Sequence, residues 1–197
     1  MSFEDRVKIF EGQKFYKTKI CELYRELPIR QVDEEIWIAS NHKLVLGKDV
    51  EFTQKVGKEL ASRIKPYNPD VLLTAEAKAL PLAYEIAREL GLRKILVARK
   101  EVKSYMKKYL VEEVKSITTS KIQKLVLELD EKIEGKRICL FDDVVSTYGT
   151  MNALEKLVKR AGGEIVCKAA VWLEGPWYEG KDLIYLEILP IWVTERK

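Results

Sequence analysis

Nine consecutive residues combine the groups that a protein needs to hold a phosphorylated sugar. They are Asp142, Asp143, Val144, Val145, Ser146, Thr147, Tyr148, Gly149 and Thr150. The hydroxyls and backbone N–H groups of such a loop, with the positive end of a helix dipole, bind a phosphate. The two carboxylates can accept hydrogen bonds from sugar hydroxyls or hold a magnesium ion through water. The segment therefore predicts a site for a phosphorylated sugar.

The segments on either side of this loop predict the elements that position it. The apolar run 138–141 precedes the loop and the amphipathic segment 151–160 follows it. This pattern indicates a buried strand, a tight loop and a helix. An Asp-Asp pair alone is also found at strand ends in response-regulator-like folds, or can cap a helix. The Ser-Thr-x-Gly-Thr continuation favours the phosphate site.

The rest of the chain alternates between predicted strands and helices. Apolar runs predict strands at 70–74, 94–98, 137–141, 165–172 and 183–189, the last at an edge. Helical spacing of apolar residues predicts helices over 52–64 and 78–90. This order over 50–172 indicates a doubly wound α/β fold, a mostly parallel sheet with helices on both faces. Ligands on such sheets bind beyond the carboxyl ends of the strands, where residues 75–78, 99–120 and 142–150 arrive.

Three other segments have less regular patterns. Residues 3–26 predict a helix that Pro28 ends, and 35–40 with 43–47 predict a hairpin around Asn41 and His42. The Lys- and Tyr-rich residues 99–120 are too long for an ordinary connection and predict a flexible lid. Residues 122–129 alternate in part, which is typical of an antiparallel strand.

Composition restricts the class of protein. The 197 residues suffice for one α/β domain with a small appendage, and 47% are apolar. We expect a cytoplasmic protein, since the chain has no spanning apolar run, no signal-peptide pattern and three scattered cysteines. The net charge of +4 is too balanced to argue for nucleic-acid binding. Charged residues are abundant at 34%, which suggests a thermophile.

Several motifs resemble those of type I phosphoribosyltransferases, most closely the adenine and xanthine enzymes. The strand and loop at 138–150 resemble the family's motif for 5-phosphoribosyl 1-pyrophosphate (PRPP), except that Tyr148 stands where members usually carry glycine. Residues 74–79 resemble the family's Glu-Ala-Arg loop, and 97–100 resemble its Arg-Lys before the catalytic loop. Asn41 and His42 resemble an Asn-His pair in the base-recognition region of xanthine enzymes. The matches cover roughly 40–175.

The resemblance implies roles for specific residues. Asp142 and Asp143 would bind the ribose hydroxyls and take part in catalysis. Lys100 and Lys103, also catalytic, would close over the leaving group. The 5′-phosphate would be bound by Val145, Ser146, Thr147, Tyr148, Gly149 and Thr150. Ala75, Glu76, Ala77, Lys78 and Arg99 would bind the pyrophosphate. Asn41 and His42 would have a weak base-binding role. No protein cage for a metal is expected, because Mg²⁺ would be bound through PRPP near Asp142 and Asp143.

The resemblance also implies a domain plan and a reaction. Residues 1–48, an N-terminal helix and hairpin, would form a hood for base recognition with 176–197, and 49–175 would form the PRPP-binding core. We expect a phosphoribosyltransferase of purine salvage, a homodimer, that uses PRPP and a purine. Adenine is favoured and xanthine or hypoxanthine is the alternative. A PRPP-sensing regulator and a nucleotide-phosphorolysing protein remain other hypotheses. The tail 174–178 could also line the pocket.

Overall fold

The computed structural model describes residues 5–114, 123–130, 132–179 and 181–194. One of its two five-stranded sheets is parallel, with its strands in the order β11-β10-β9-β5-β6. These strands are β5 (Val71–Ala75), β6 (Ile95–Ala98), β9 (Arg137–Val145), β10 (Glu164–Glu174) and β11 (Glu187–Leu189). Because β5 and β9 are covered on both faces, they are apolar along most of their length. This confirms the predicted α/β fold.

The order of the strands determines where a ligand can bind. Numbered along the chain, the five strands lie in the order 2-1-3-4-5, in which the direction of winding reverses between β5 and β9. In open α/β sheets, ligands bind in the crevice at this reversal, beyond the carboxyl ends of the strands. The loops after β5 and β9 both begin at this point.

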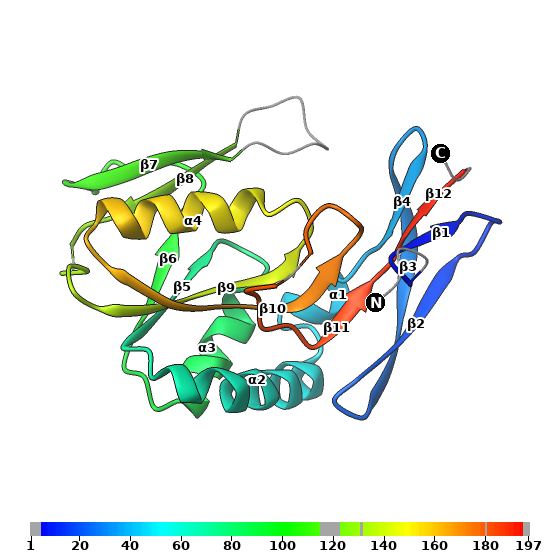
Figure 1. The fold of residues 1–197 in the computed structure, drawn as a ribbon, viewed down its shortest axis with the longest axis horizontal. Helices are drawn as coiled ribbons and strands as arrows, with labels where there is room; N and C mark the ends of the chain where they lie inside the picture. The colour runs from blue at the N-terminus through cyan, green and yellow to red at the C-terminus, as the bar shows by residue number, and fades with distance from the viewer. Residues whose placement is uncertain (1–4, 115–122, 131, 180, 195–197) are drawn as a thin grey trace.

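Helices cover both faces of the sheet (Figure 1). On one face lies α4 (Gly149–Arg160), and on the other lie α2 (Val50–Ile64) and α3 (Leu80–Glu89), with the 3₁₀ turn η2 (Lys65–Tyr67) after α2. The start of α2 is capped by Asp49, whose carboxylate accepts a hydrogen bond from the Phe52 amide. Among the described residues, no helix is long and apolar enough to cross a lipid bilayer.

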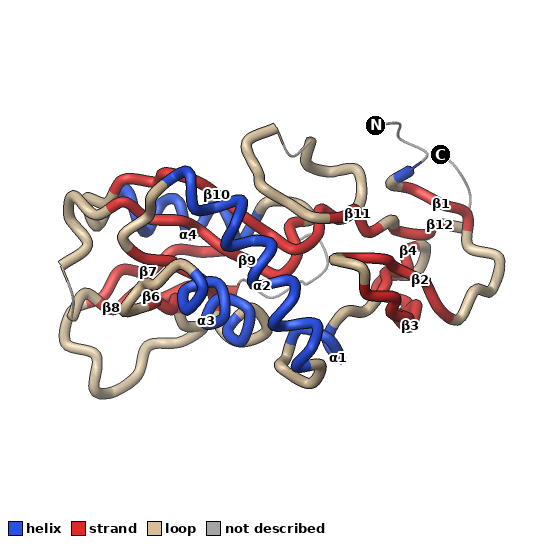
Figure 2. The backbone as a smooth tube through the Cα atoms, turned by 90° about the horizontal axis from the view of Figure 1, so that it is seen from below, coloured by secondary structure: helices blue, strands red, loops and turns tan. Residues whose placement is uncertain are grey.

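A second five-stranded sheet joins the two ends of the chain, in the order β1-β12-β4-β3-β2. Its strands are β1 (Val7–Ile9), β2 (Phe15–Ile20), β3 (Leu23–Asp33), β4 (Ile36–Ala39) and β12 (Ile191–Val193). It lies at one end of the parallel sheet (Figures 1 and 2). The N-terminal and C-terminal segments therefore form one unit beside the core.

The predicted helix over 3–26 is wrong, because its described residues form β1, β2 and the start of β3. The buried positions Thr18 and Ile20 alternate with the exposed Lys17 and Lys19, which is the two-residue period of a strand. The β2–β3 hairpin turns at Cys21 and Glu22, whose φ angles are 48° and 62°. Turns with two left-handed residues usually contain Asn-Gly, so Cys21-Glu22 carries no turn signal.

The predicted strand over 43–47 is also wrong. The chain instead forms the short helix α1 (His42–Val45), in which Leu44 and Val45 are buried. β4 is confirmed as a strand, but it pairs with β3 and β12. A short apolar run does not distinguish a strand from a buried helical turn.

Part of the segment predicted as a lid is regular. β7 (Tyr109–Val114) pairs antiparallel with β8 (Gln123–Glu128), and this confirms the antiparallel strand predicted near 122–129. The pair is joined to the end of β6 through a bridge between Arg99 and Val126. It also lies along α4, where Arg160 bonds the Val111 carbonyl and the Glu112 carboxylate. Residues 115–122 are outside the described part of the chain.

Candidate active site

A cavity of about 340 Å³ lies where β5 and β9 end. The cavity is lined by Ala75, Glu76, Ala77, Lys78 and Ala79 from the loop after β5, and by 142–151 from β9 and the loop that follows. The remaining lining residues are Ile38, Lys100, Val114, Gln123, Leu125 and Glu174. The fold therefore brings together the two segments that the sequence singled out, at the reversal of the strand order.

The turn from β9 into α4 has the shape of an anion site. Tyr148 is the N-cap of α4 and adopts a left-handed conformation, with φ 67° and ψ 6°. Gly149 then begins the helix, so the backbone N–H groups of its first turn face the end of the cavity. A left-handed conformation costs a non-glycine residue of order 1–3 kcal/mol, which the surrounding contacts must offset.

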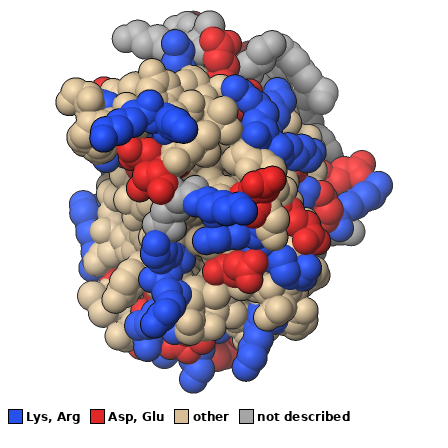
Figure 3. Space-filling model, turned by 90° about the vertical axis from the view of Figure 1, so that its left-hand side faces the viewer, with Lys and Arg blue, Asp and Glu red and all other residues tan. Residues whose placement is uncertain are grey.

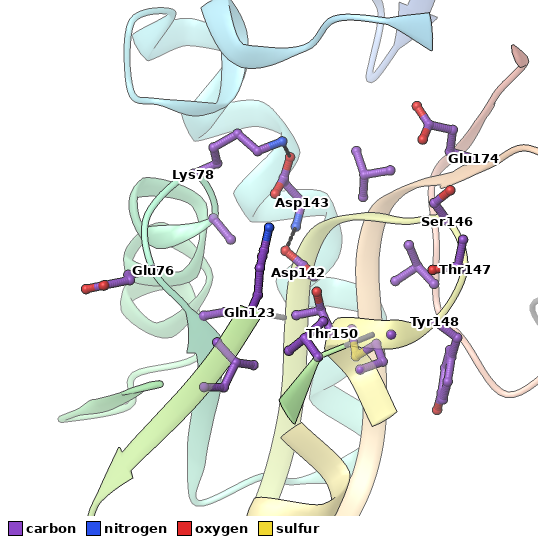
Figure 4. A pocket seen from close by; sticks show the side chains of 18 of the residues that line it. Glu76, Lys78, Gln123, Asp142, Asp143, Ser146, Thr147, Tyr148, Thr150 and Glu174 are labelled. Atoms are coloured by element: carbon purple, nitrogen blue, oxygen red, sulfur yellow. Dashed lines mark hydrogen bonds and ion pairs between the residues drawn. The ribbon is translucent and has the colours of Figure 1, made fainter. Parts of the chain in front are cut away.

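Asp143 belongs to the last residues of β9, so the strand extends four residues further than predicted. Its carboxylate is buried, and Oδ2 accepts a hydrogen bond from Lys78 Nζ at 2.9 Å (Figure 4). It also accepts one from Asn41 Nδ2 at 2.9 Å. The amide of Asp143 donates to Oδ1 of Asp142 at 2.9 Å. The pKa of Asp142 is raised well above its usual range by burial and by the neighbouring Asp143 carboxylate.

Lys78 connects the two loops across the cavity. Besides its ion pair with Asp143, its Nζ lies 3.4 Å from Oδ1 of Asn41. Burial lowers the pKa of Lys78, but the attraction of Asp143 outweighs it and the net shift is upward. Lys78 is therefore a cation in the ligand-free protein, held beside a carboxylate at the position where an anionic ligand would enter.

Glu76 points away from the other labelled side chains of the cavity (Figure 4). Its Oε1 accepts a hydrogen bond from the amide of Lys100 at 2.9 Å, and its Oε2 lies 3.2 Å from Nε of Arg99. The carboxylate thus joins the loop after β5 to the end of β6. The peptide between Glu76 and Ala77 is cis.

The basic residues predicted to close over a leaving group are not all at the cavity. Lys100 lines it. Arg99 instead pairs with Glu76 and donates to the hydroxyl of Tyr105 at 2.8 Å, and Lys103 pairs with Glu101. Of the two residues assigned to the base, Asn41 contacts Asp143, whereas His42 lies 2.8 Å from the hydroxyl of Ser40 through Nδ1.

Glu174 is the last residue of β10 and is buried beside Ser146 of the loop at 146–150. Burial raises the pKa of its carboxyl to about 7, although Lys78 and the hydroxyl of Ser146 act in the opposite direction. Of the tail 174–178, Glu174 lines the cavity, whereas residues 175–178 are not among its lining residues. Four other lining residues have no individual role in the sequence prediction: Ile38, Val114, Gln123 and Leu125. Val114 does lie in the segment 99–120 predicted to reach this edge of the sheet, and Ile38 lies in the predicted hood 1–48. The four come from β4 and the β7–β8 ribbon, and no local motif marks them.

This arrangement has a definite chemical capacity. An anion-binding helix N-terminus lies at one end of the cavity, two carboxylates lie in the middle, and the ammonium of Lys78 lies on the opposite loop. Such a cavity can hold a ligand that carries two separated anionic groups with hydroxyls between them.

Comparison with known proteins supports this interpretation. Residues 49–192 match the family described as the phosphoribosyl transferase domain. The adenine phosphoribosyltransferase of Cytophaga hutchinsonii is 28% identical over 70% of this chain and 73% of its own length. The xanthine phosphoribosyltransferase of Chloroflexus aurantiacus is 29% identical over 87% and 83%. The crystal structure of adenine phosphoribosyltransferase from Thermoanaerobacter pseudethanolicus superimposes with a TM-score of 0.65 at 20% identity, covering 89% and 95%, and so shares the fold.

Proposed function

Because this chain belongs to the phosphoribosyl transferase domain family, we propose that it transfers the 5-phosphoribosyl group from PRPP to a purine base, with adenine preferred. The products are a nucleoside 5′-monophosphate and pyrophosphate. Xanthine and hypoxanthine are the alternative acceptors. Named relatives include both adenine and xanthine enzymes at similar identity, so they support a purine without selecting one.

The observation that carries the proposal is the meeting of two loops at one cavity. The helix N-terminus at Gly149 and the ammonium of Lys78 lie on different loops, with Asp142 and Asp143 between them. PRPP has a phosphate on C5 and a pyrophosphate on C1, with hydroxyls on the ring between them. The order of groups in the cavity matches the order of groups in PRPP.

The reaction is a displacement at the ribose C1. The bond from C1 to the pyrophosphate oxygen breaks, and its electron pair leaves with the pyrophosphate. A ring nitrogen of the purine then bonds to C1 and gives up its proton to the departing pyrophosphate or to water. Positive charge develops on the ribose ring in between, so groups that hold the ring and neutralise the leaving group lower the barrier.

Each group of residues then has a role in this reaction. Residues 145–150 hold the 5′-phosphate. Asp142 and Asp143 accept hydrogen bonds from the ribose hydroxyls, and negative charge on this pair favours the developing cation. Lys78 and Lys100, which both line the cavity, neutralise the pyrophosphate. Arg99 acts through Glu76, since it pairs with that carboxylate and so supports the loop at 75–78.

The donor set of the cavity suits Mg²⁺, which prefers oxygen ligands and keeps several of its waters. Asp142, Asp143, Ser146 and Thr147 supply such oxygens. When bound, Mg²⁺ would add positive charge beside the pyrophosphate. The carboxylates of Asp142 and Asp143 would hold it from the protein side, through the ribose hydroxyls or water.

The base would lie on the side of the cavity that faces the N- and C-terminal sheet. Ile38 of β4 reaches the cavity from that sheet and gives an apolar contact for a purine ring. This supports the proposal that 1–48 and 176–197 form a hood over the core. Asn41 contacts Asp143, and so we assign it to the ribose side of the site.

A regulatory protein on the same fold is the second hypothesis, and it would need a nucleic-acid surface. On the face shown in Figure 3, Lys and Arg side chains are interspersed with Asp and Glu. Mixed charge of this kind does not favour a phosphate backbone.

The test is to measure pyrophosphate release from PRPP and Mg²⁺ with adenine, hypoxanthine, guanine, xanthine, uracil and orotate in separate reactions. Asp143→Asn serves as the variant that keeps the shape of the side chain but removes its charge. We expect release with a purine and its loss in the variant. Absence of release with every base, while PRPP still binds, would favour the sensor.

A further inference from the structure

Tyr148 connects the loop at 146–150 to three other parts of the structure. Its ring packs on that of Tyr178, with centroids 4.4 Å apart. Its hydroxyl donates a hydrogen bond to Oε1 of Glu155 on α4 and accepts one from Nζ of Lys168 on β10 at 2.7 Å. Tyr148, the N-cap of α4, is therefore held in place by its side chain as well as by its backbone.

The partners of Tyr148 are also bonded to one another. Lys168 donates to Oε1 of Glu155 at 3.1 Å and pairs with Asp182, which accepts a hydrogen bond from the hydroxyl of Tyr178. The ammonium of Lys168 also lies 5.3 Å from the centroid of the Tyr148 ring. Burial opposes the charge of Lys168, but these bonds raise its pKa overall, so the cluster keeps its cation. The cluster joins the loop at 148 to Tyr178 and Asp182.

The backbone of Tyr148 shows why such a fixed side chain matters. With φ at 67°, the residue occupies a conformation that side chains with a Cβ rarely adopt. This conformation turns the chain from β9 into α4, and the carbonyl of Tyr148 accepts the helical hydrogen bond from the Asn152 amide at 2.9 Å. The direction of the N–H groups at the start of α4 therefore depends on this one residue.

We infer that Tyr148 is a positioning residue, whose side chain, anchored by Glu155, Lys168 and Tyr178, holds the loop at 146–150 in the conformation that binds a phosphate before the ligand arrives. Glu155, Lys168 and Tyr178 are not among the residues that line the cavity, so the anchor acts through the loop. It lowers the conformational freedom that binding must otherwise remove, so its contribution belongs to affinity for the phosphate. This inference rests on the proposed function only for the identity of the phosphorylated ligand.

Two variants separate the parts of the anchor. Tyr148→Phe keeps the ring against Tyr178 and removes the hydroxyl. Tyr148→Gly allows φ near 67° without strain and removes the whole side chain. The exposed Tyr84 on α3 gives the matched control Tyr84→Phe. Because Tyr148→Phe removes the hydrogen bonds with Glu155 and Lys168 that hold the loop, we expect it to raise KM for PRPP about three- to tenfold. Tyr148→Gly removes the whole anchor and should raise KM for PRPP further.

Amide hydrogen exchange over 146–150 in the ligand-free protein gives a readout that does not depend on turnover. We expect faster exchange in this segment in both Tyr148 variants and no change in Tyr84→Phe. Unchanged exchange and an unchanged KM in Tyr148→Gly would overturn the inference. If the parent protein neither binds nor consumes PRPP, the proposed function fails, while the exchange rates still decide whether Tyr148 orders the loop.

Discussion

Nζ of Lys78 lies 2.9 Å from Oδ2 of Asp143, so the loop after β5 and the end of β9 are joined by an ion pair across the cavity. Asp143 is buried, and a buried carboxylate is stable in its charged form when a cation and hydrogen-bond donors accompany it. A ligand with a pyrophosphate would compete for the same ammonium. The ion pair thus marks the place where the leaving group would be neutralised.

Replacement of Lys78 by methionine should weaken PRPP binding. The variant removes the cation from the loop after β5, and a charge-assisted contact contributes about 1.5–3 kcal/mol, which corresponds to roughly 10- to 150-fold in KM for PRPP. Lys78→Arg should recover part of the loss because it keeps the charge. The measurement is initial-rate kinetics with varied PRPP. Lys58→Met on the exposed face of α2 is the control, and a KM for Lys78→Met equal to that of this control would refute the role.

Replacement of Asn41 by alanine should raise KM for PRPP. The increase should be about the same whichever base is the acceptor. Its amide donates to Asp143 at 2.9 Å, and its loss leaves the buried carboxylate with one donor fewer. The measurement is kcat/KM for adenine, hypoxanthine and xanthine in the parent and in the variant. A changed ratio between the bases would instead assign Asn41 to base recognition.

Glu174→Gln should change how stability depends on pH. The folded protein raises the pKa of Glu174 from 4.5 to about 7, so the folded state binds the proton more tightly than the unfolded state does. The parent therefore loses stability as the pH rises from about 4.5 to 7, by up to roughly 3 kcal/mol from this group. Glutamine stays neutral, so the variant should lack this loss.

The measurement for Glu174 is urea unfolding between pH 4.5 and 8. The variant should gain stability relative to the parent as the pH rises, whereas Glu113→Gln, at an exposed position of β7, should run parallel to the parent. Parallel curves for Glu174→Gln and the parent would show that the carboxyl of Glu174 titrates normally in the folded protein.

Removal of Mg²⁺ should abolish turnover and leave the melting temperature of the ligand-free protein unchanged. Within the described residues, no group of three or more His, Cys, Asp or Glu side chains could hold a metal ion. The metal would therefore enter with PRPP and add little to the stability of the protein alone. The measurements are pyrophosphate release and thermal melts with and without EDTA. A fall in melting temperature on chelation would reveal a metal bound by the protein itself.

The central part of the fold could be predicted because its signals are local. The run at 138–141 is apolar at every position and the run at 71–75 at every position but Thr74, and the residues that follow them carry the chemistry. Alternation of strands and helices then places both loops at the same edge of the sheet. Tyr148 is unusual by its place in the loop, and its φ of 67° explains why that position is demanding.

The rest could not be predicted because it depends on contacts between distant residues. β1 pairs with β12, and these strands are separated by nearly the whole chain. The hairpin at Cys21 and Glu22 lacks the glycine that would have marked it. Glu76 follows β5 as predicted, but Arg99 and the Lys100 amide draw its carboxylate away from the cavity. Side-chain direction of this kind is set by partners that a motif does not contain.

The most direct test of the account is the stoichiometry of products from PRPP, Mg²⁺ and adenine, followed by chromatography. Phosphoribosyl transfer predicts AMP and pyrophosphate in equal amounts, each equal to the PRPP consumed, and neither product in the absence of the base. Pyrophosphate formed without a nucleotide, or no consumption of PRPP with adenine, xanthine or hypoxanthine, would contradict the assignment of this cavity to phosphoribosyl transfer to a purine.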